Sequence, residues 1–250
     1  FLDNNMSCCP ANSLPANPTK SDATPIKVGN TDVFFYDNAT SSTLVLVFPD
    51  VFGPDSGRTK DNCVKLSARY KVALVDLAPE YVPDLSNVGE WIKARPFEGL
   101  VGKIHDVVAH FKASHGVTTF GAVGYCWGAW VVAKYSADPS TALSAGVSFH
   151  PSWGAEQLFH GEGSGAKIAE SITVPQLILA AGNDPDWLKP GGAVETTLAA
   201  RGIAHKLREF PLVSHGWVNR GDLTDANTAE AFHAAWHDEA LPFLEQHLTK

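Results

Sequence analysis

Cysteine is scarce in this 250-residue sequence, and its spacing excludes two common kinds of site. The only cysteines are Cys8, Cys9, Cys63 and Cys126. Their spacing fits neither a disulfide framework nor a zinc site of paired Cys-x-x-Cys clusters. We therefore expect a reducing compartment, the cytoplasm. Two interpretations of the adjacent Cys8 and Cys9 stay open: a lipidation or redox site, or spare exposed thiols.

Long apolar runs and basic runs are also missing. No stretch approaches the roughly 18 apolar residues of a membrane helix, and the start FLDNNMSCCP lacks the regions of a secretory signal. A net charge of -8 without a basic run argues against nucleic acid or anionic lipid, because phosphates are bound by clustered Lys and Arg. We expect no membrane or nucleic-acid partner, a small-molecule substrate, and a monomer or small homo-oligomer.

A chain of 250 residues has the length of a single α/β domain. Residues 1–25 are rich in Pro, Asn, Ser and Ala and predict an extended N-terminal tail that runs over the surface. Residues 26–250 alternate short β-rich runs with stretches of helical period, which predicts an α/β domain with a mostly parallel, doubly wound sheet and helices on both faces. The predicted strands are 33–36, 43–48, 71–76, 119–124, 143–149, 175–180 and 205–210.

Between the strands, apolar residues recur at helical spacing over 100–111 and 229–240, and these stripes predict core faces. Pro242 lies inside the last helical pattern and should kink or restart that helix. The connection 78–97 contains three prolines and shows little periodicity. Because it follows the carboxyl end of a strand, we expect it to lie over the site; the alternative is an ordinary surface excursion.

The segment Gly124-Tyr125-Cys126-Trp127-Gly128 places a cysteine at the nucleophile position of a G-x-S-x-G elbow. It follows a predicted strand and opens a predicted helix, as that motif requires. The glycines allow close packing around a strained turn, and the helix N-terminus favours a thiolate. This predicts Cys126 as nucleophile; the alternative is a buried cysteine in a Gly-rich turn.

A nucleophilic cysteine needs a base, and His215 follows the last predicted strand in LVSHGW. His150, in the SFHPSW turn after a central strand, is the competitor and could instead line the pocket. The orienting acid should follow the strand before that of the base, where AGNDPDW offers Asp184 and Asp186. Asp184 lies nearer the strand end, and Asp186 is expected to start a helix or face solvent.

The chain order Cys126, Asp184, His215 is that of the α/β-hydrolase triad. The oxyanion of an acyl transfer also needs hydrogen-bond donors. One should be the backbone N–H of Trp127, and the other that of Val51 or Phe52 in the early loop VFPDVFG.

Together, GYCWG, AGNDPD, SHGW and PDVFG resemble the dienelactone hydrolase family of α/β-hydrolases, from about residue 28 to the C-terminus. The resemblance implies a Cys126, Asp184 and His215 triad, with the N–H groups of Trp127 and Val51 as the oxyanion hole. It also implies hydrolysis of lactones or related esters with no metal or organic cofactor.

In the bacterial members of that family, a glutamate ahead of Ile-Phe-Gly holds the resting thiol protonated until substrate arrives. Asp50 stands at that place here, so the resemblance implies that it modulates the thiol, although its side chain is one methylene shorter than glutamate. The alternative is that Asp50 only hydrogen-bonds its own turn. Those enzymes also hold a substrate carboxylate with arginines. The candidate substrate-binding residues of this chain are Tyr125, Arg95, His150, Trp217 and Arg220.

These observations predict a hydrolase of small lactones or esters that works through an acyl-cysteine intermediate. Two alternatives stay open. The same triad would also serve a thioesterase or a transacylase. A non-catalytic protein could keep the fold and use Cys126 to bind or sense electrophiles.

Overall fold

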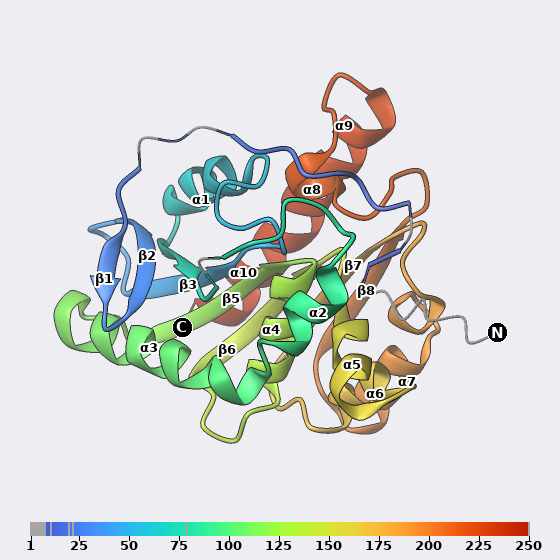
Figure 1. Cartoon of the computed structure of the whole chain (residues 1–250). Helices are drawn as coiled ribbons and strands as arrows, with labels where there is room; N and C mark the ends of the chain where they lie inside the picture. Colours follow the sequence, from blue (N-terminus) through green and yellow to red (C-terminus); the bar gives the residue numbers. More distant parts are fainter. Residues whose placement is uncertain (1–8, 11, 20, 22, 79, 250) are drawn as a thin grey trace.

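One sheet of eight strands runs through the molecule (Figure 1). The computed structural model describes residues 9–10, 12–19, 21, 23–78 and 80–249. The strands are β1 (Ile26–Val28), β2 (Thr31–Tyr36), β3 (Thr43–Phe48), β4 (Lys71–Asp76), β5 (Thr119–Tyr125), β6 (Leu143–Phe149), β7 (Gln176–Ala181) and β8 (His205–Phe210). Their spatial order is β1-β2-β4-β3-β5-β6-β7-β8. Pairing is parallel from β4 to β8 and antiparallel at β1 and β2, which confirms the predicted mostly parallel sheet.

Of the predicted strands, β3, β4, β6 and β8 have the expected ends, and β2, β5 and β7 differ by one or two residues at an end. The prediction missed β1 altogether. This strand has three residues at the edge of the sheet, and the side chains of Ile26 and Lys27 are exposed. Such a strand carries no apolar run by which a sequence pattern could reveal it.

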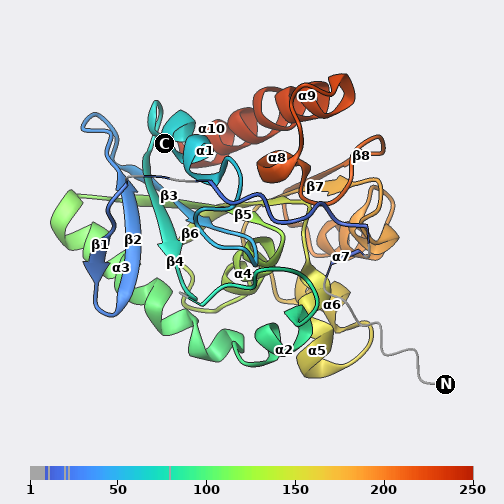
Figure 2. The same ribbon diagram turned by 45° about the horizontal axis from the view of Figure 1, so that its top comes forward.

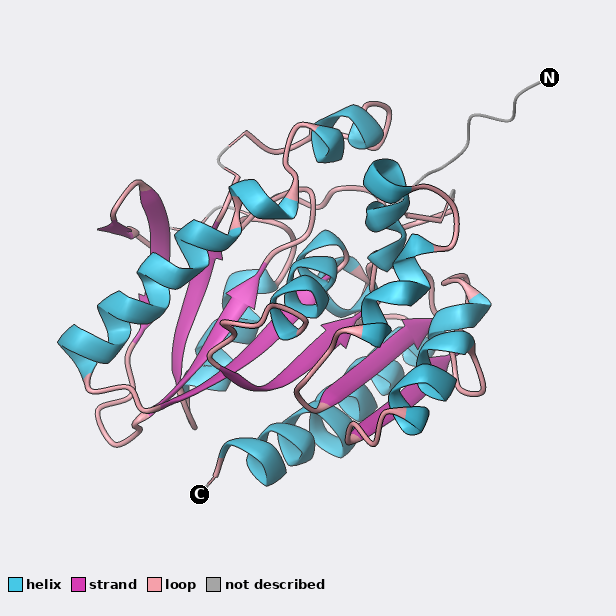
Figure 3. Ribbon diagram, turned by 90° about the horizontal axis from the view of Figure 1, so that it is seen from below, coloured by secondary structure: helices cyan, strands magenta, loops and turns pink. Residues whose placement is uncertain are grey.

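The helices cover both faces of the sheet (Figures 2 and 3). In Figure 2, α1, α9 and α10 lie on one side of the sheet, and α2, α3 and α5 lie on the other. The helices are α1 (Thr59–Ser67), α2 (Val88–Lys93), α3 (Val101–His115), α4 (Trp127–Ser136), α5 (Gln157–His160), α6 (Ser164–Lys167), α7 (Ala193–Ala200), α8 (Trp217–Arg220), α9 (Ala226–His233) and α10 (Leu241–Leu248), with a π-helical segment η5 (Ala234–Ala240).

Two hydrophobic cores result, one on each face of the sheet. Leu44 and Leu46 of β3 pack in the core that α3, α4 and α7 cover. Val45 and Val47 of the same strand pack in the core that α1, α9 and α10 cover. Successive strand side chains point to opposite faces, so a strand buried on both sides is apolar throughout.

The C-terminal helix changes its winding where the proline pattern predicted a restart. The chain passes from α9 through η5 into α10, and Pro242 lies in the first turn of α10. Proline is tolerated there because the first-turn N–H has no partner within its own helix. None of the helices in the described ranges has the length and apolar composition needed to cross a membrane.

The connection 78–97 lies against the loops at the carboxyl ends of the strands, as expected. It contains α2, a six-residue helix that the prediction missed because it is too short for a clear period. The ring of Trp91 in α2 meets that of Trp127 edge-on at 5.0 Å. The N–H of Val82 donates to the carbonyl of Val51 at 3.1 Å. The connection thus packs beside both predicted oxyanion donors.

Candidate active site

Cys126 stands between β5 and α4 on a strained turn. Its φ is 55° and its ψ is -115°, and only one other non-glycine residue of the described ranges, His150, has a positive φ. A Cβ on Gly124 would lie 2.3 Å from the carbonyl oxygen of Gly128, and a Cβ on Gly128 would lie 2.1 Å from that of Phe48. Both glycines are therefore needed for the helix to leave the strand at this angle.

His215 and Asp184 form a buried pair beside this turn. Asp184 follows β7, and its Oδ1 lies 2.6 Å from Nδ1 of His215 with both side chains fully buried. The N–H of Ala181 donates to the other carboxylate oxygen at 2.7 Å, and Asn183 Oδ1 accepts from the N–H of His215 at 2.7 Å. The carboxylate fixes the ring so that Nδ1 carries the hydrogen and Nε2 can accept a proton.

Ser152 connects the thiol to the imidazole, and the sequence analysis missed it. Its Oγ lies 3.2 Å from Sγ of Cys126 and 3.4 Å from Nε2 of His215. Its N–H donates to the carbonyl of Cys126 at 3.0 Å, which fixes it to the elbow. Its position just after β6, whose carboxyl end adjoins that of β5, was the available signal.

Cys9 also lies at this site, so the interpretation of the tail thiols as exposed is wrong for Cys9. Its side chain is buried, and its Sγ lies 3.4 Å from Sγ of Cys126. Nearby, the N–H of Leu14 donates to the carbonyl of His215 at 2.9 Å. The described part of the tail is held by such hydrogen bonds to loops, which composition does not reveal. Cys8 lies outside the described residues.

Burial and neighbouring groups shift the pKa values at the site. Burial raises the pKa of Cys126 well above its ordinary value, the nearby Cys9 raises it further, and His215 opposes both. Burial lowers the pKa of His215, but the charges of Asp184 and then Cys126 outweigh it and raise that pKa to about 9. Burial thus favours the neutral form of the Cys126 thiol, while Asp184 favours the protonated form of the His215 imidazole.

Two backbone N–H groups, that of Trp127 and that of Val51 or Phe52, are expected from the sequence to receive an oxyanion. Within the described ranges, neither the N–H of Trp127 nor that of Val51 donates a hydrogen bond to another residue. The N–H of Phe52 is already engaged, because it donates to Oδ1 of Asp50 at 2.9 Å. Of the two donors left open by the sequence, Val51 is therefore the available one.

Asp50 accepts hydrogen bonds from its own turn and forms a buried ion pair with Arg220. Its Oδ2 also accepts from Oγ of Ser56 at 2.9 Å and from Nδ2 of Asn219 at 2.7 Å. Arg220 in turn donates to the carbonyl of Leu14 at 3.1 Å. The charge of Asp50 is thus compensated locally by Arg220, whose Nε, Nη1 and Nη2 each donate at least one hydrogen bond.

We expect Asp50→Asn to destabilise the fold by about 3 kcal/mol, because it leaves the guanidinium of Arg220 buried without its counter-charge. Urea denaturation of the variant against wild type measures this loss. Asp55→Asn is the matched control, since the Asp55 side chain is about half exposed and its pair with Lys60 is worth little. Equal denaturation midpoints for the two variants would contradict a stabilising role of the pair.

His150 lies next to the proposed base but does not share its partners. Its ring is 4.9 Å from that of His215 and 5.3 Å from that of Trp217. Burial, then the charges of His215 and Arg220, hold its pKa well below the ordinary value. Within the described residues, neither ring nitrogen of His150 nor Nε1 of Trp217 has a hydrogen-bond partner. Both side chains are fully buried, and Trp217 belongs to the core on the face of the sheet opposite Cys126, so a role of either in binding substrate stays a prediction.

Tyr125 and Arg95 are less directly connected to the thiol. The ring of Tyr125 stacks on Phe149 at 5.4 Å in the core on the opposite face of the sheet from Cys126. Arg95 lies 4.3 Å above the ring of Trp91 and donates to that residue's carbonyl at 2.9 Å. Arg95 thus reaches the elbow only through Trp91.

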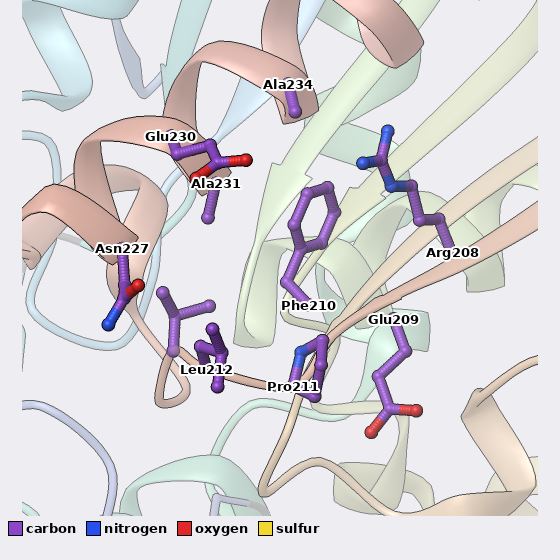
Figure 4. A pocket seen from close by; sticks show the side chains of 10 residues that line it. Arg208, Glu209, Phe210, Pro211, Leu212, Asn227, Glu230, Ala231 and Ala234 are labelled. Carbon is purple, nitrogen blue, oxygen red and sulfur yellow. The ribbon is translucent and has the colours of Figure 1, made fainter.

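The hollow in Figure 4 is a separate feature. It measures about 170 Å³ and lies between the end of β8 and α9, and Phe210, Leu212 and Asn227 are among its lining residues. Its lining includes neither Cys126 nor His215. Because the expected acyl transfer requires a nucleophile and a base, the elbow rather than this hollow is the candidate active site.

Comparisons with known proteins identify the family of the chain. The sequence profile of the dienelactone hydrolase family matches residues 32–248. A search of curated proteins found no match. A candidate dienelactone hydrolase of Klebsiella pneumoniae is structurally similar, with 19% identity, a TM-score of 0.68 and coverage of 86% of this chain and 94% of that one.

Two further solved structures share the fold. A dienelactone hydrolase of Anabaena variabilis is 16% identical, with a TM-score of 0.59 and coverage of 92% of this chain and 99% of that one. A dienelactone hydrolase-like promiscuous phosphotriesterase from metagenomic libraries is 17% identical, with a TM-score of 0.59 and coverage of 90% and 94%.

Proposed function

The chain belongs to the dienelactone hydrolase family, and on that premise we propose that it hydrolyses small esters or lactones through an acyl-cysteine intermediate. In this proposal Cys126 is the nucleophile, His215 the base and Asp184 the residue that orients the base. The observation that carries it is the buried 2.6 Å contact between Asp184 and His215 beside a cysteine on a strained elbow.

The first half of the reaction would form the acyl-enzyme. His215 Nε2 takes the proton of Cys126 as Sγ attacks the carbonyl carbon, and the N–H groups of Trp127 and Val51 stabilise the oxyanion. When the tetrahedral intermediate collapses, the C–O bond breaks and the leaving alkoxide takes the proton from His215. A lactone keeps this alcohol on its acyl chain.

The second half would repeat these steps with water. His215 takes a proton from water, the resulting hydroxide attacks the thioester carbon, and the C–S bond breaks to release the acid. Sγ of Cys126 recovers its proton from His215. Because Cys126 is 1% exposed and Cys9 lies against it, the segment that carries Cys9 has to move before a substrate can reach the thiol.

We expect kcat/KM to rise with pH and to level off above about pH 9. His215 accepts a proton only when neutral, and the charges of Asp184 and Cys126 raise its pKa to about 9 against the effect of burial. Its neutral fraction should therefore grow about tenfold per pH unit between about pH 6 and pH 8. A pH–rate profile with a chromogenic ester checks this; a flat or falling profile over that range would contradict it.

A panel of small lactones and p-nitrophenyl esters tests the proposed function. An enzyme should turn over many equivalents, and rapid quenching should trap the acyl group on Cys126 as a mass increase. A protein that only binds electrophiles would stop after one equivalent. Including thioesters and alcohol acceptors in the panel separates hydrolysis of esters from thioesterase and transacylase activity.

A further inference from the structure

Four donor atoms from distant parts of the chain meet beside the nucleophile. They are Sγ of Cys9, Sγ of Cys126, Oγ of Ser152 and Nε2 of His215, and their side chains are all buried. Sγ of Cys9 lies 3.4 Å from both Sγ of Cys126 and Oγ of Ser152. Ser152 Oγ is 3.2 Å from Sγ of Cys126 and 3.4 Å from Nε2 of His215. The two sulfurs and the imidazole nitrogen lie within 4.8 Å of one another.

These separations resemble the edges of a tetrahedral metal site. Bond lengths of about 2.3 Å to sulfur and about 2.0 Å to nitrogen put two sulfurs about 3.8 Å apart and sulfur and nitrogen about 3.5 Å apart. The two sulfurs, at 3.4 Å, would have to separate by only a few tenths of an ångström. The proposed hydrolysis gives Cys9 no role, so its position at the site needs another explanation.

We propose that Cys9, Cys126 and His215 together bind a soft divalent ion such as Zn²⁺, and that this ion reversibly blocks the site. Ser152 Oγ lies where the fourth ligand belongs, and either it or a water molecule completes the tetrahedron. The ion replaces the protons of both thiols, and the charges of two thiolates and one divalent ion sum to zero. A neutral set is the combination that a buried site accepts most readily.

Asp184 supports this assignment because it contacts one of the proposed ligands, His215, at the ring nitrogen that does not face the ion. A histidine ligand of zinc almost always donates its other ring N–H to a carboxylate, a backbone carbonyl or a water molecule, which orients the ring toward the metal. Asp184 makes this contact with Nδ1 of His215 at 2.6 Å. Since a bound ion occupies both Cys126 and His215, neither could act as nucleophile or base until the ion leaves.

Metal titration of the full, reduced chain tests the proposal. Calorimetry should show one Zn²⁺ per chain, and Co²⁺ should give the thiolate charge-transfer and visible bands of a tetrahedral site with two sulfur ligands. We expect Cys9→Ala to weaken Zn²⁺ binding at least about 100-fold, because even substitution of a residue that hydrogen-bonds a ligand typically lowers metal affinity about 10- to 100-fold. Cys63→Ala is the control, because Cys63 is buried in the core on the opposite face.

Two outcomes would overturn the proposal: unchanged Zn²⁺ affinity in Cys9→Ala, or a Co²⁺ spectrum with one thiolate ligand or none. Circular dichroism establishes that each variant is folded, and Cys9→Ser replaces Cys9→Ala if the latter is not. Binding is measured without a substrate, so it can succeed even if the proposed hydrolysis fails. If the chain is a hydrolase, one equivalent of Zn²⁺ should inhibit it, and a chelator should restore activity.

Discussion

Cys126→Ala should lower kcat for a chromogenic ester at least about 10⁴-fold, because removal of a covalent nucleophile leaves only the contributions of binding and the oxyanion hole. Alanine is smaller than cysteine, so the buried site can accept it. Cys63→Ala removes another buried thiol far from the elbow and should leave kcat near the wild-type value. Steady-state kinetics of the two purified variants gives the comparison.

Chemical labelling tests the same assignment independently. Iodoacetamide should modify Cys126 and abolish activity, and Cys63, which is fully buried and whose pKa burial raises, should react slowly. Because Cys126 is itself buried against Cys9, its labelling should become faster in Cys9→Ala. Peptide mass spectrometry locates the label. Full activity after complete labelling of Cys126, or near wild-type turnover by Cys126→Ala, would exclude it as the nucleophile.

Asp184→Asn should reduce kcat by up to about 10⁴-fold, the effect of the corresponding change in serine triads. The amide can donate a hydrogen bond to Nδ1 of His215, which places the ring hydrogen on Nε2, where a base needs a lone pair. The effect is expected to be smaller than in those serine enzymes, because a thiol loses its proton more easily than a hydroxyl. Since the charge of Asp184 raises the pKa of His215, the bend of the pH–rate profile should also move to lower pH.

Asp186→Asn is a closely matched control. Asp186 lies two residues away, and its side chain is 97% exposed. Among the described residues its one ion pair is with Lys189 at 3.1 Å. We expect kcat to change less than about twofold, since such a surface pair is worth little. Severe loss in Asp186→Asn with mild loss in Asp184→Asn would move the orienting role to Asp186.

The fold and the proposed triad could be predicted because their signals are local. Strands buried on both faces appear as unbroken apolar runs, as in β3 and β4. The two glycines that flank Cys126 predict the elbow. The sequence pattern predicts the strand 205–210, and His215 follows it. Short elements such as β1 and α2 contain too few residues to show a period.

The remaining parts of the site depend on contacts between distant residues. Cys9 and Cys126 are 117 positions apart, and nothing in the composition of the tail shows that it returns to the elbow. Whether Val51 or Phe52 can donate to an oxyanion depends on the orientation of the Asp50 side chain. Oδ1 of Asp50 accepts a hydrogen bond from the N–H of Phe52, which leaves that of Val51. Ser152 acquires its place only when β5 and β6 pair.

Arg220 connects three segments that carry different parts of the site. It pairs with Asp50 of the loop VFPDVFG and donates to the carbonyl of Leu14 in the N-terminal segment. It lies in α8, directly after the loop that carries His215. Residues that share one buried network do not contribute independently to stability. The free energies of substitutions in these segments will therefore not add, and double-mutant cycles through Arg220 should give coupling energies of roughly 0.5–3 kcal/mol. A substitution in the N-terminal segment should therefore also change the stability of the loop that carries Asp50.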